Sequence, residues 1–277
     1  MMSLIRFLTS LFLVCFAIVP AIGQTTTMTF NIRYDNPDDG KNAWSNRKTE
    51  VVKLIATHAP DIIGLQEALP NQVSYIHEHL DGYSFIGHGR DGVNTNSEAT
   101  PIFYNNHKFE LLDQKLFWLS ETPEEISKGW DAALNRIALY GKFRNMETGV
   151  LLHILNTHLD HRGETARRRS AELLLDFIRK KELEGQQIVL MGDFNAIPEA
   201  SSLGTLKKLL FDAREVVQQP ASGPEATFNG FDTDKDPDKR IDYIFVKNLS
   251  VKTYQCIDSK RKNGLYPSDH FPIIISF

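Results

Sequence analysis

Apolar residues in this 277-residue chain fall mostly in short runs, each of strand length, and few helical repeats separate them. Apolar residues at helical spacing occur only in residues 46–58 and 164–184. Ser45 is the expected N-cap of the first of these helices. Many strands with few helices between them do not fit a simple alternating parallel sheet. They predict an α/β four-layer sandwich in which two packed, mostly antiparallel β-sheets are flanked by helices. The expected strands are residues 26–34, 59–68, 83–87, 100–105, 109–119, 135–143, 150–160, 186–195, 240–246, 249–257 and 270–277.

The first 23 residues have the pattern of an export signal. Arg6 precedes an apolar run from Phe7 to Val19, and the small-residue pattern at residues 21–23 resembles a cleavage site. That run is short for a membrane span, which takes about 20 apolar residues. We therefore predict a signal peptide over residues 1–23, a mature catalytic domain over residues 24–277, a secreted or periplasmic location and no stable membrane insertion.

Composition limits what the mature chain can be. Cys15 lies inside the predicted signal, so Cys256 is left alone and cannot form an intrachain disulfide. Arg6 is the one charged residue of that signal, which leaves 30 Lys and Arg against 35 Asp and Glu, a net charge of −5. Such a balance does not favour tight binding to nucleic acid, although a local basic patch remains compatible with it.

Polar residues repeatedly follow apolar strands. Asn31, Glu67 and the pair Asp193 and Asn195 come at or just after predicted strands. Such positions are where a rigid scaffold usually presents a functional site. Later in the chain, the same pattern places Asp242 within a strand and the residues Asp269 and His270 ahead of the last strand.

Six short motifs occur in a characteristic order: FNIR, GLQE, NTHLD, GDFNA, RIDYIFV and SDHFPI. In this order the chain resembles the endonuclease/exonuclease/phosphatase superfamily, which has the fold of pancreatic deoxyribonuclease, over nearly its whole mature length. The segments FWLSETPEE and GWDAALNRI also resemble an exported bacterial branch of that superfamily. The resemblance implies a two-sheet sandwich, a divalent metal and hydrolysis of a phosphate ester.

The resemblance also implies a metal site. Glu67 is the best candidate ligand, because hard carboxylate oxygens suit Mg²⁺ or Mn²⁺. Asn31 resembles the family amide beside that metal, and Asp269 resembles the late carboxylate that approaches it. Asp193 would position or deprotonate the attacking water, and Asn195 would hold the phosphate. Because alternate residues of a strand share one side, Asp193 and Asn195 are expected to point to one place.

Two histidines complete the implied catalytic set. His270 resembles the family histidine that contacts the scissile phosphate, and Asp242 would fix its tautomer and favour its charged form. His158 would lie on the leaving-group side, and Glu98 matches the carboxylate that pairs with it. Arg136 is either a phosphate clamp or one half of a salt bridge at a strand end.

The stretch from Leu155 to Glu164 contains two histidines and an aspartate, but strand alternation argues against a local metal site there. Asp160 and His161 are expected to be loop or supporting residues. The acidic stretch over residues 232–239 has Pro237 where a calcium loop requires glycine, so a solvated loop is expected. The loops at residues 91–97 and 122–131 are expected to set specificity.

The sequence identifies the reaction more sharply than the substrate. A phosphodiesterase is expected, with nucleic acid, a lipid head group, an inositol phosphate or a glycan phosphate as the ester, and a monomer as the working form. A non-specific secreted endonuclease on DNA or RNA is the alternative. However, Ala68, Leu69 and Pro70 follow Glu67, where deoxyribonucleases of the pancreatic type carry a basic residue. A second alternative is an inactive ligand-binding protein on the same fold.

Overall fold

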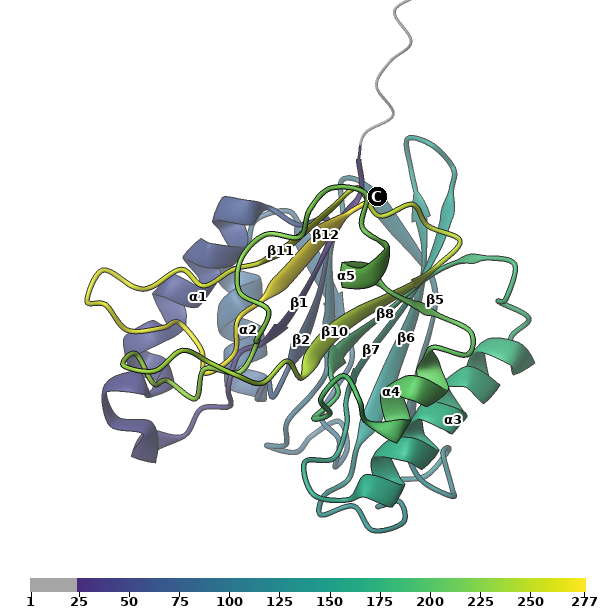
Figure 1. The fold of residues 1–277 in the computed structure, drawn as a ribbon, viewed down its shortest axis with the longest axis horizontal. Helices are drawn as coiled ribbons and strands as arrows, with labels where there is room; N and C mark the ends of the chain where they lie inside the picture. The colour runs from purple at the N-terminus through teal and green to yellow at the C-terminus, as the bar shows by residue number, and fades with distance from the viewer. Residues whose placement is uncertain (1–23) are drawn as a thin grey trace, which may run out of the picture.

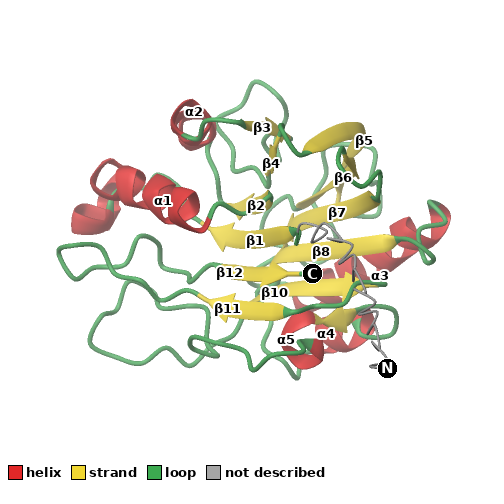
Figure 2. Cartoon of the chain, turned by 90° about the horizontal axis from the view of Figure 1, so that it is seen from above, coloured by secondary structure: helices red, strands yellow, loops and turns green. Residues whose placement is uncertain are grey.

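Two six-stranded sheets form the centre of the molecule in the computed structural model, which describes residues 24–277 (Figures 1 and 2). The predicted signal peptide, residues 1–23, lies outside the described residues. The first sheet has the order β11 (Thr253–Cys256), β12 (Ile273–Ser276), β1 (Thr26–Asn31), β2 (Ile62–Gln66), β4 (Ile102–Asn105) and β3 (Tyr83–Ile86). The second has the order β5 (Phe109–Trp118), β6 (Ile137–Asn145), β7 (Leu151–His158), β8 (Gln187–Asp193), β10 (Asp242–Lys247) and β9 (Phe211–Asp212).

Most neighbouring strands run antiparallel, as the sequence predicts. The exceptions are one parallel pair in each sheet, β1 with β2 and β7 with β8. Because of this arrangement, β1, β2, β7 and β8 end at one edge of the sandwich, and β10 begins there. The register sets Asp242 opposite Asp193 and His158 beside Asp193.

Helices cover both outer faces of the sandwich (Figure 2). On the first sheet, α1 (Trp44–His58) and α2 (Pro70–His79) bury apolar residues against the strands. On the second, α3 (Glu164–Lys180) and α4 (Ser201–Leu206) do the same. The remaining helices are the short 3₁₀ helix η1 (Pro37–Asn42) and α5 (Ala213–Val216). This confirms the four-layer α/β sandwich.

The core is divided among three layers, and β8 shows why. Ile188 and Leu190 pack outward under α3 and α4, whereas Val189 and Met191 pack inward between the sheets. This is the alternation of a strand buried on both faces, so its sequence reads as a continuous apolar run rather than alternating apolar and polar residues.

Both predicted helices exist, but their ends differ from the prediction. α1 begins at Trp44, so Ser45 lies inside the helix and is not its N-cap; Ala43 occupies that position without a side-chain hydrogen bond. The reason is that η1 runs almost directly into α1, and the chain has turned before Ser45 is reached. α3 ends at Lys180 rather than Glu184, and Glu182 has a left-handed backbone with φ of 55°. A turn at residues 145–149 joins β6 to β7.

A buried polar network joins the two sheets beneath the strand ends. The Gln66 amide donates to Asn156 Oδ1 at 2.7 Å, and the Asn156 amide donates to the backbone carbonyls of Leu65 and Pro101 at 2.8 and 3.0 Å. These bonds fix β7 against β2. Among residues 24–277, no helix is both long and apolar enough to cross a membrane.

Candidate active site

A cleft of about 720 Å³ opens where the strands β1, β2, β7 and β8 end. Of the ten residues predicted for the site, eight line this cleft, and Asn31 and Asp242 lie behind it as hydrogen-bond partners of its lining. The eight are Glu67, Glu98, Arg136, His158, Asp193, Asn195, Asp269 and His270. The fold thus brings together residues separated by up to 239 positions in the chain.

Asp193 is the central carboxylate of the cleft. Its Oδ2 accepts from the Asn31 amide at 2.9 Å and lies 3.4 Å from His158 Nε2 and 3.8 Å from His270 Nε2. Burial and the nearby Asp242 carboxylate raise the pKa of Asp193 to about 7, against the lowering effect of His270. A carboxylate with that pKa can both accept and release a proton near neutrality.

The backbone before Asp193 explains the glycine in the GDFN motif. Gly192 has φ of 150°, and a Cβ at this position would lie 2.0 Å from the Thr157 carbonyl oxygen. Only glycine lets β8 pass so close to β7 there. That approach brings Asp193 beside His158.

Asn195 reaches the cleft by a different route from the one predicted. Strand β8 ends at Asp193, and Asn195 has a left-handed backbone with φ of 47°, so strand alternation does not place it. Instead, its backbone N–H donates to Asp193 Oδ1 at 2.8 Å, and its amide donates to the Leu159 carbonyl at 3.0 Å. A tight turn, rather than a strand, aims both side chains into one site.

The two histidines have opposite electrostatic states. His270 Nδ1 lies 2.8 Å from Asp242 Oδ2. Burial alone would lower the pKa of His270, but Asp242, together with Asp193 and Asp269, raises it well above its usual value. Burial, reinforced by Arg136, holds the pKa of His158 well below its usual value. The neutral His158 ring can therefore accept the hydrogen bond from the Asn195 amide, which lies 3.0 Å from its Nε2.

Three groups could hold a metal ion together, namely Glu67, Asp193 and His270, since one ligand atom of each lies within 4.8 Å of the others. The sequence pointed to Glu67, Asn31 and Asp269. The Asn31 amide donates to Glu67 Oε1 at 3.0 Å, and the Asn31 side-chain oxygen accepts from the Arg33 backbone. Asn31 thus orients Glu67. The carboxylate Oδ2 of Asp269 lies 3.9 Å from Arg33 Nε.

The residues present fit a hard divalent cation. Three acidic side chains, Glu67, Asp193 and Asp269, line the cleft. Burial raises the pKa of Asp269, as it does that of Asp193, because the charged forms are poorly solvated there. A bound cation would balance the negative charge of these buried carboxylates. Carboxylate oxygens are the ligands that Mg²⁺ and Mn²⁺ prefer.

Arg136 is both a salt-bridge partner and an open donor. Its Nε meets Asp160 Oδ2 at 3.3 Å and its Nη2 meets His161 Nδ1 at 3.1 Å. Its Nη1 is buried with no hydrogen-bond partner among the described residues. The two alternatives drawn from the sequence therefore describe different atoms of one guanidinium group, and Nη1 is free for a ligand oxygen.

Asp160 is buried and supports this arrangement. Besides Arg136, its carboxylate accepts from the backbone N–H groups of Arg162 and Gly163 at 2.9 and 2.8 Å. Burial opposes ionisation, but these hydrogen bonds outweigh it and lower the pKa of Asp160. Asp160 therefore anchors Arg136, and its role as a supporting residue agrees with the sequence interpretation.

Glu98 does not pair with His158 as expected. Both of its carboxylate oxygens accept from Arg90, at 2.9 and 2.8 Å. The bidentate geometry of a guanidinium outcompetes a neutral imidazole for a carboxylate. His158 instead faces Asn195 and Asp193. This partner of Glu98 was missed because Arg90 follows a weak strand and belongs to no recognisable motif.

Other cleft residues also went unrecognised. Arg33, Tyr34, Phe228 and Lys239 line the cleft. Arg33 is held by Asp39 through two hydrogen bonds at 3.0 and 3.1 Å. It lies inside the FNIR motif, two residues after Asn31, so its position could have drawn attention to it.

Arg47 fixes the walls of the cleft from behind. Its fully buried guanidinium donates to the carbonyls of Asn42, Ile32, Arg33 and Pro267. Burial lowers the pKa of Arg47 to about 10. The loop after β1 is thereby tied to the segment that carries Asp269 and His270. Nothing in the helical pattern of α1 distinguished this arginine from a solvated one.

Known proteins resemble the chain over nearly its whole length. A solved endonuclease/exonuclease/phosphatase from Bacteroides vulgatus is 38% identical with a TM-score of 0.86, covering 92% of this chain and 98% of that one. A mannosyl-6-phosphatase from Bacteroides thetaiotaomicron is 34% identical with a TM-score of 0.85, covering 91% and 98%. An uncharacterized protein of Acanthamoeba polyphaga mimivirus is 29% identical over 84% of this chain and 92% of its own length.

The family model described as Endonuclease/Exonuclease/phosphatase family matches residues 28–270. This match spans all ten residues of the predicted site. It agrees with the two-sheet fold and with the cleft at the strand ends. The chain belongs to the Endonuclease/Exonuclease/phosphatase family.

Proposed function

We propose that this protein is a divalent-metal-dependent hydrolase of phosphate esters and that its substrate is a phosphorylated sugar. The observation that carries the proposal is the position of Asp193, which lies between His158 and His270 beside Glu67 in one cleft. Members of this family are phosphoester hydrolases, so the coarse reaction follows from membership.

Glu67 and Asp269 would hold the cation, and Mg²⁺ or Mn²⁺ would supply positive charge for the phosphate oxygens. The Asn31 amide donates to both the Glu67 and the Asp193 carboxylates and so orients them within the cleft. Arg136 Nη1 adds a further donor for a phosphate oxygen.

Asp193 is the group that would take a proton from the attacking water, because its pKa lies near neutrality. His270 carries a proton at neutral pH and can donate a charged hydrogen bond to the phosphate. His158 is neutral, so it suits the role of a hydrogen-bonding wall on the leaving-group side better than that of a proton donor.

The substrate class rests on two observations. The solved relative with the name mannosyl-6-phosphatase shares 34% identity over 91% of this chain. The cleft, at about 720 Å³, has the size of a small-molecule site. The charge of the mature chain and the lack of a basic residue behind Glu67 count against duplex DNA.

A substrate panel tests the proposal. Mannose 6-phosphate, bis(p-nitrophenyl) phosphate, inositol phosphates, sphingomyelin, RNA and plasmid DNA would each be tested with Mg²⁺, with Mn²⁺ and with EDTA. We expect the sugar monoester to give the highest kcat/KM and EDTA to abolish turnover. Preference for bis(p-nitrophenyl) phosphate or a nucleic acid would favour the phosphodiesterase expected from sequence. Turnover without metal would overturn the mechanism.

Variants separate an enzyme from an inactive binding protein. Asp193→Ala and His270→Ala should abolish turnover, whereas Asp236→Ala, in the exposed acidic loop, serves as the matched control. Absence of turnover by the unaltered protein on every ester would favour the binding-protein alternative.

We also propose that the protein is exported, works outside the cytoplasm and is a monomer, in keeping with the exported bacterial branch that its sequence resembles. Sequencing the N-terminus of protein recovered from a native host should give Gln24 as the first residue, and light scattering should give the mass of one chain. Recovery of intact Met1 would contradict export.

A further inference from the structure

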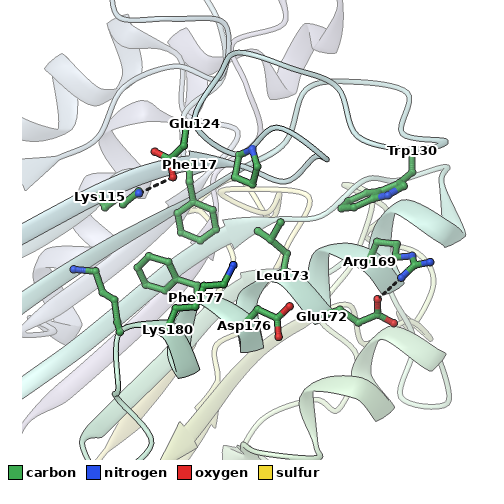
Figure 3. A pocket seen from close by; sticks show the side chains of 12 residues that line it. Lys115, Phe117, Glu124, Trp130, Arg169, Glu172, Leu173, Asp176, Phe177 and Lys180 are labelled. Carbon is green, nitrogen blue, oxygen red and sulfur yellow. Dashed lines mark hydrogen bonds and ion pairs between the residues drawn. The ribbon is translucent and has the colours of Figure 1, made fainter.

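A second cavity, of about 400 Å³, lies outside the catalytic cleft (Figure 3). Its walls come from β5, the loop that follows it and the outer face of α3. The apolar floor is formed by Phe117 and Phe177, which stack at 4.7 Å between ring centroids, together with Leu173. We call this cavity the aromatic groove.

Trp130 forms one side of the aromatic groove, and its backbone is held in an unfavourable conformation. Its φ is 48°, a left-handed value that is unfavourable for a bulky residue. Its backbone N–H donates to Glu121 Oε2 at 3.2 Å, and the next residue, Asp131, accepts from the Ala166 N–H at 2.6 Å. These contacts keep the indole beside α3. Trp44 and Trp118, by contrast, are buried, with 4% and 8% exposure.

Charged groups of both signs surround the apolar floor. Lys115 pairs with Glu124 at 2.7 Å, and Arg169 pairs with Glu172 at 3.0 Å (Figure 3). A nucleic acid phosphate would meet carboxylates here, and a wholly apolar ligand would bury these ion pairs without offering them hydrogen bonds. A sugar ring matches both parts, since its C–H face packs on aromatic rings while its hydroxyls both donate and accept hydrogen bonds.

One loop lines both the aromatic groove and the catalytic cleft. Residues 119–136 join β5 to β6, and the loop presents Trp130 to the groove and Leu134 and Arg136 to the cleft. An oligosaccharide that contacts both sites would have to lie along this loop. The loop at residues 122–131 is the one expected from sequence to set specificity.

We propose that the aromatic groove binds a neutral sugar unit of an oligosaccharide whose phosphate enters the catalytic cleft. The inference rests on the proposed function for its view of the substrate, but the groove can be tested without catalysis. Trp130 and the half-buried Phe177 hold the sugar ring, the buried Phe117 supports Phe177 by stacking beneath it, and the charged rim contacts the sugar hydroxyls.

Binding of unphosphorylated mannotetraose, in EDTA, is the test. Isothermal titration should show saturable binding, and Trp130 fluorescence should change, because the other two tryptophans are buried. Trp130→Ala should weaken binding about tenfold or more, and Trp130→Phe should retain part of it. Leu173→Glu, a half-buried position on α3, should also weaken binding by placing charge on the floor.

Phe211→Ala is the matched control, since Phe211 is an exposed aromatic residue on β9, 57% accessible, that does not line the groove. The inference would be overturned if the unaltered protein showed no saturable binding, or if Trp130→Ala and Leu173→Glu both bound mannotetraose as tightly as the unaltered protein. So would saturation by an extended peptide or an oligonucleotide but not by the sugar.

The outcomes for the two sites are distinguishable. Mannotetraose binding without hydrolysis of mannose 6-phosphate would support sugar binding in the groove and contradict the proposed substrate. Hydrolysis of mannose 6-phosphate without mannotetraose binding would do the reverse.

Discussion

His270 Nδ1 and Asp242 Oδ2 lie 2.8 Å apart, and both residues are buried. Asp242 is the first residue of β10, and His270 comes just before β12. The pair keeps His270, one of the two histidines beside Asp193, in its protonated form. Burial and the nearby Arg136 keep His158 neutral, although the Asp193 carboxylate lies 3.4 Å from its Nε2. Two identical side chains are thus given different chemical roles by their neighbours.

Replacing Asp242 with asparagine should lower kcat by roughly 10²–10⁴-fold, because the charge that keeps His270 protonated is removed. Since Asp242 raises the His270 pKa, its loss lowers that pKa, and the alkaline fall in kcat should move to lower pH. The pH dependence of kcat would be measured for the variant and for Asp236→Asn as control. An unchanged alkaline limb would contradict the assignment.

Divalent metal should stabilise the folded protein. A ligand that binds only the native state at 100 times its Kd adds about 2.7 kcal/mol, which for a chain of this size raises Tm by several degrees. Thermal melts with Mg²⁺, Mn²⁺ and EDTA measure this. Glu67→Gln should remove most of the shift, whereas Asp236→Asn should keep it; an equal shift in both variants would exclude Glu67 as a ligand.

Arg90 and Glu98 should be energetically coupled. A double-mutant cycle of Arg90→Met and Glu98→Gln, followed by urea unfolding, should give a coupling free energy of about 1–3 kcal/mol, because the pair is bidentate and mostly shielded from solvent. The matched cycle of His158→Asn with Glu98→Gln should give less than about 0.5 kcal/mol. A larger coupling free energy for His158 with Glu98 than for Arg90 with Glu98 would support the pairing of Glu98 with His158 that the sequence predicts.

His153 should make the protein less stable in acid. Burial, with Lys142 and Lys181 nearby, lowers the pKa of His153 to about 4, and its ring contacts the Tyr140 hydroxyl at 2.8 Å. The unfolded chain therefore binds more protons in the window from pH 6.5 to 4, and the free energy of unfolding falls as pH drops through that window.

Urea unfolding of His153→Asn measured from pH 8 to pH 4 should show a weaker dependence on pH than the unaltered protein. His107→Asn, at an exposed turn, is the control and should keep the original dependence. Parallel curves for His153→Asn and the unaltered protein would show that the buried histidine does not contribute.

The sequence alone determined the fold class and most of the candidate site. Strand periodicity is local, so the apolar runs identified most strands and the polar residues that end them, including Glu67 and Asp193. The order of motifs supplied the family. Which catalytic group stood next to which could be stated only by resemblance, and for Asp242 and His270 the structure shows the contact.

The tertiary structure alone decided the partners that local patterns do not encode. The bond between Arg90 and Glu98, the turn that aims Asn195 and the carbonyl bonds of Arg47 each depend on how separate loops and strands pack. The same is true of the aromatic groove, because Trp130 and Phe177 line one cavity only when the loop after β5 folds onto α3. Periodicity fixes the face on which a side chain lies, but side-chain pairing depends on long-range register and burial, which one sequence does not display.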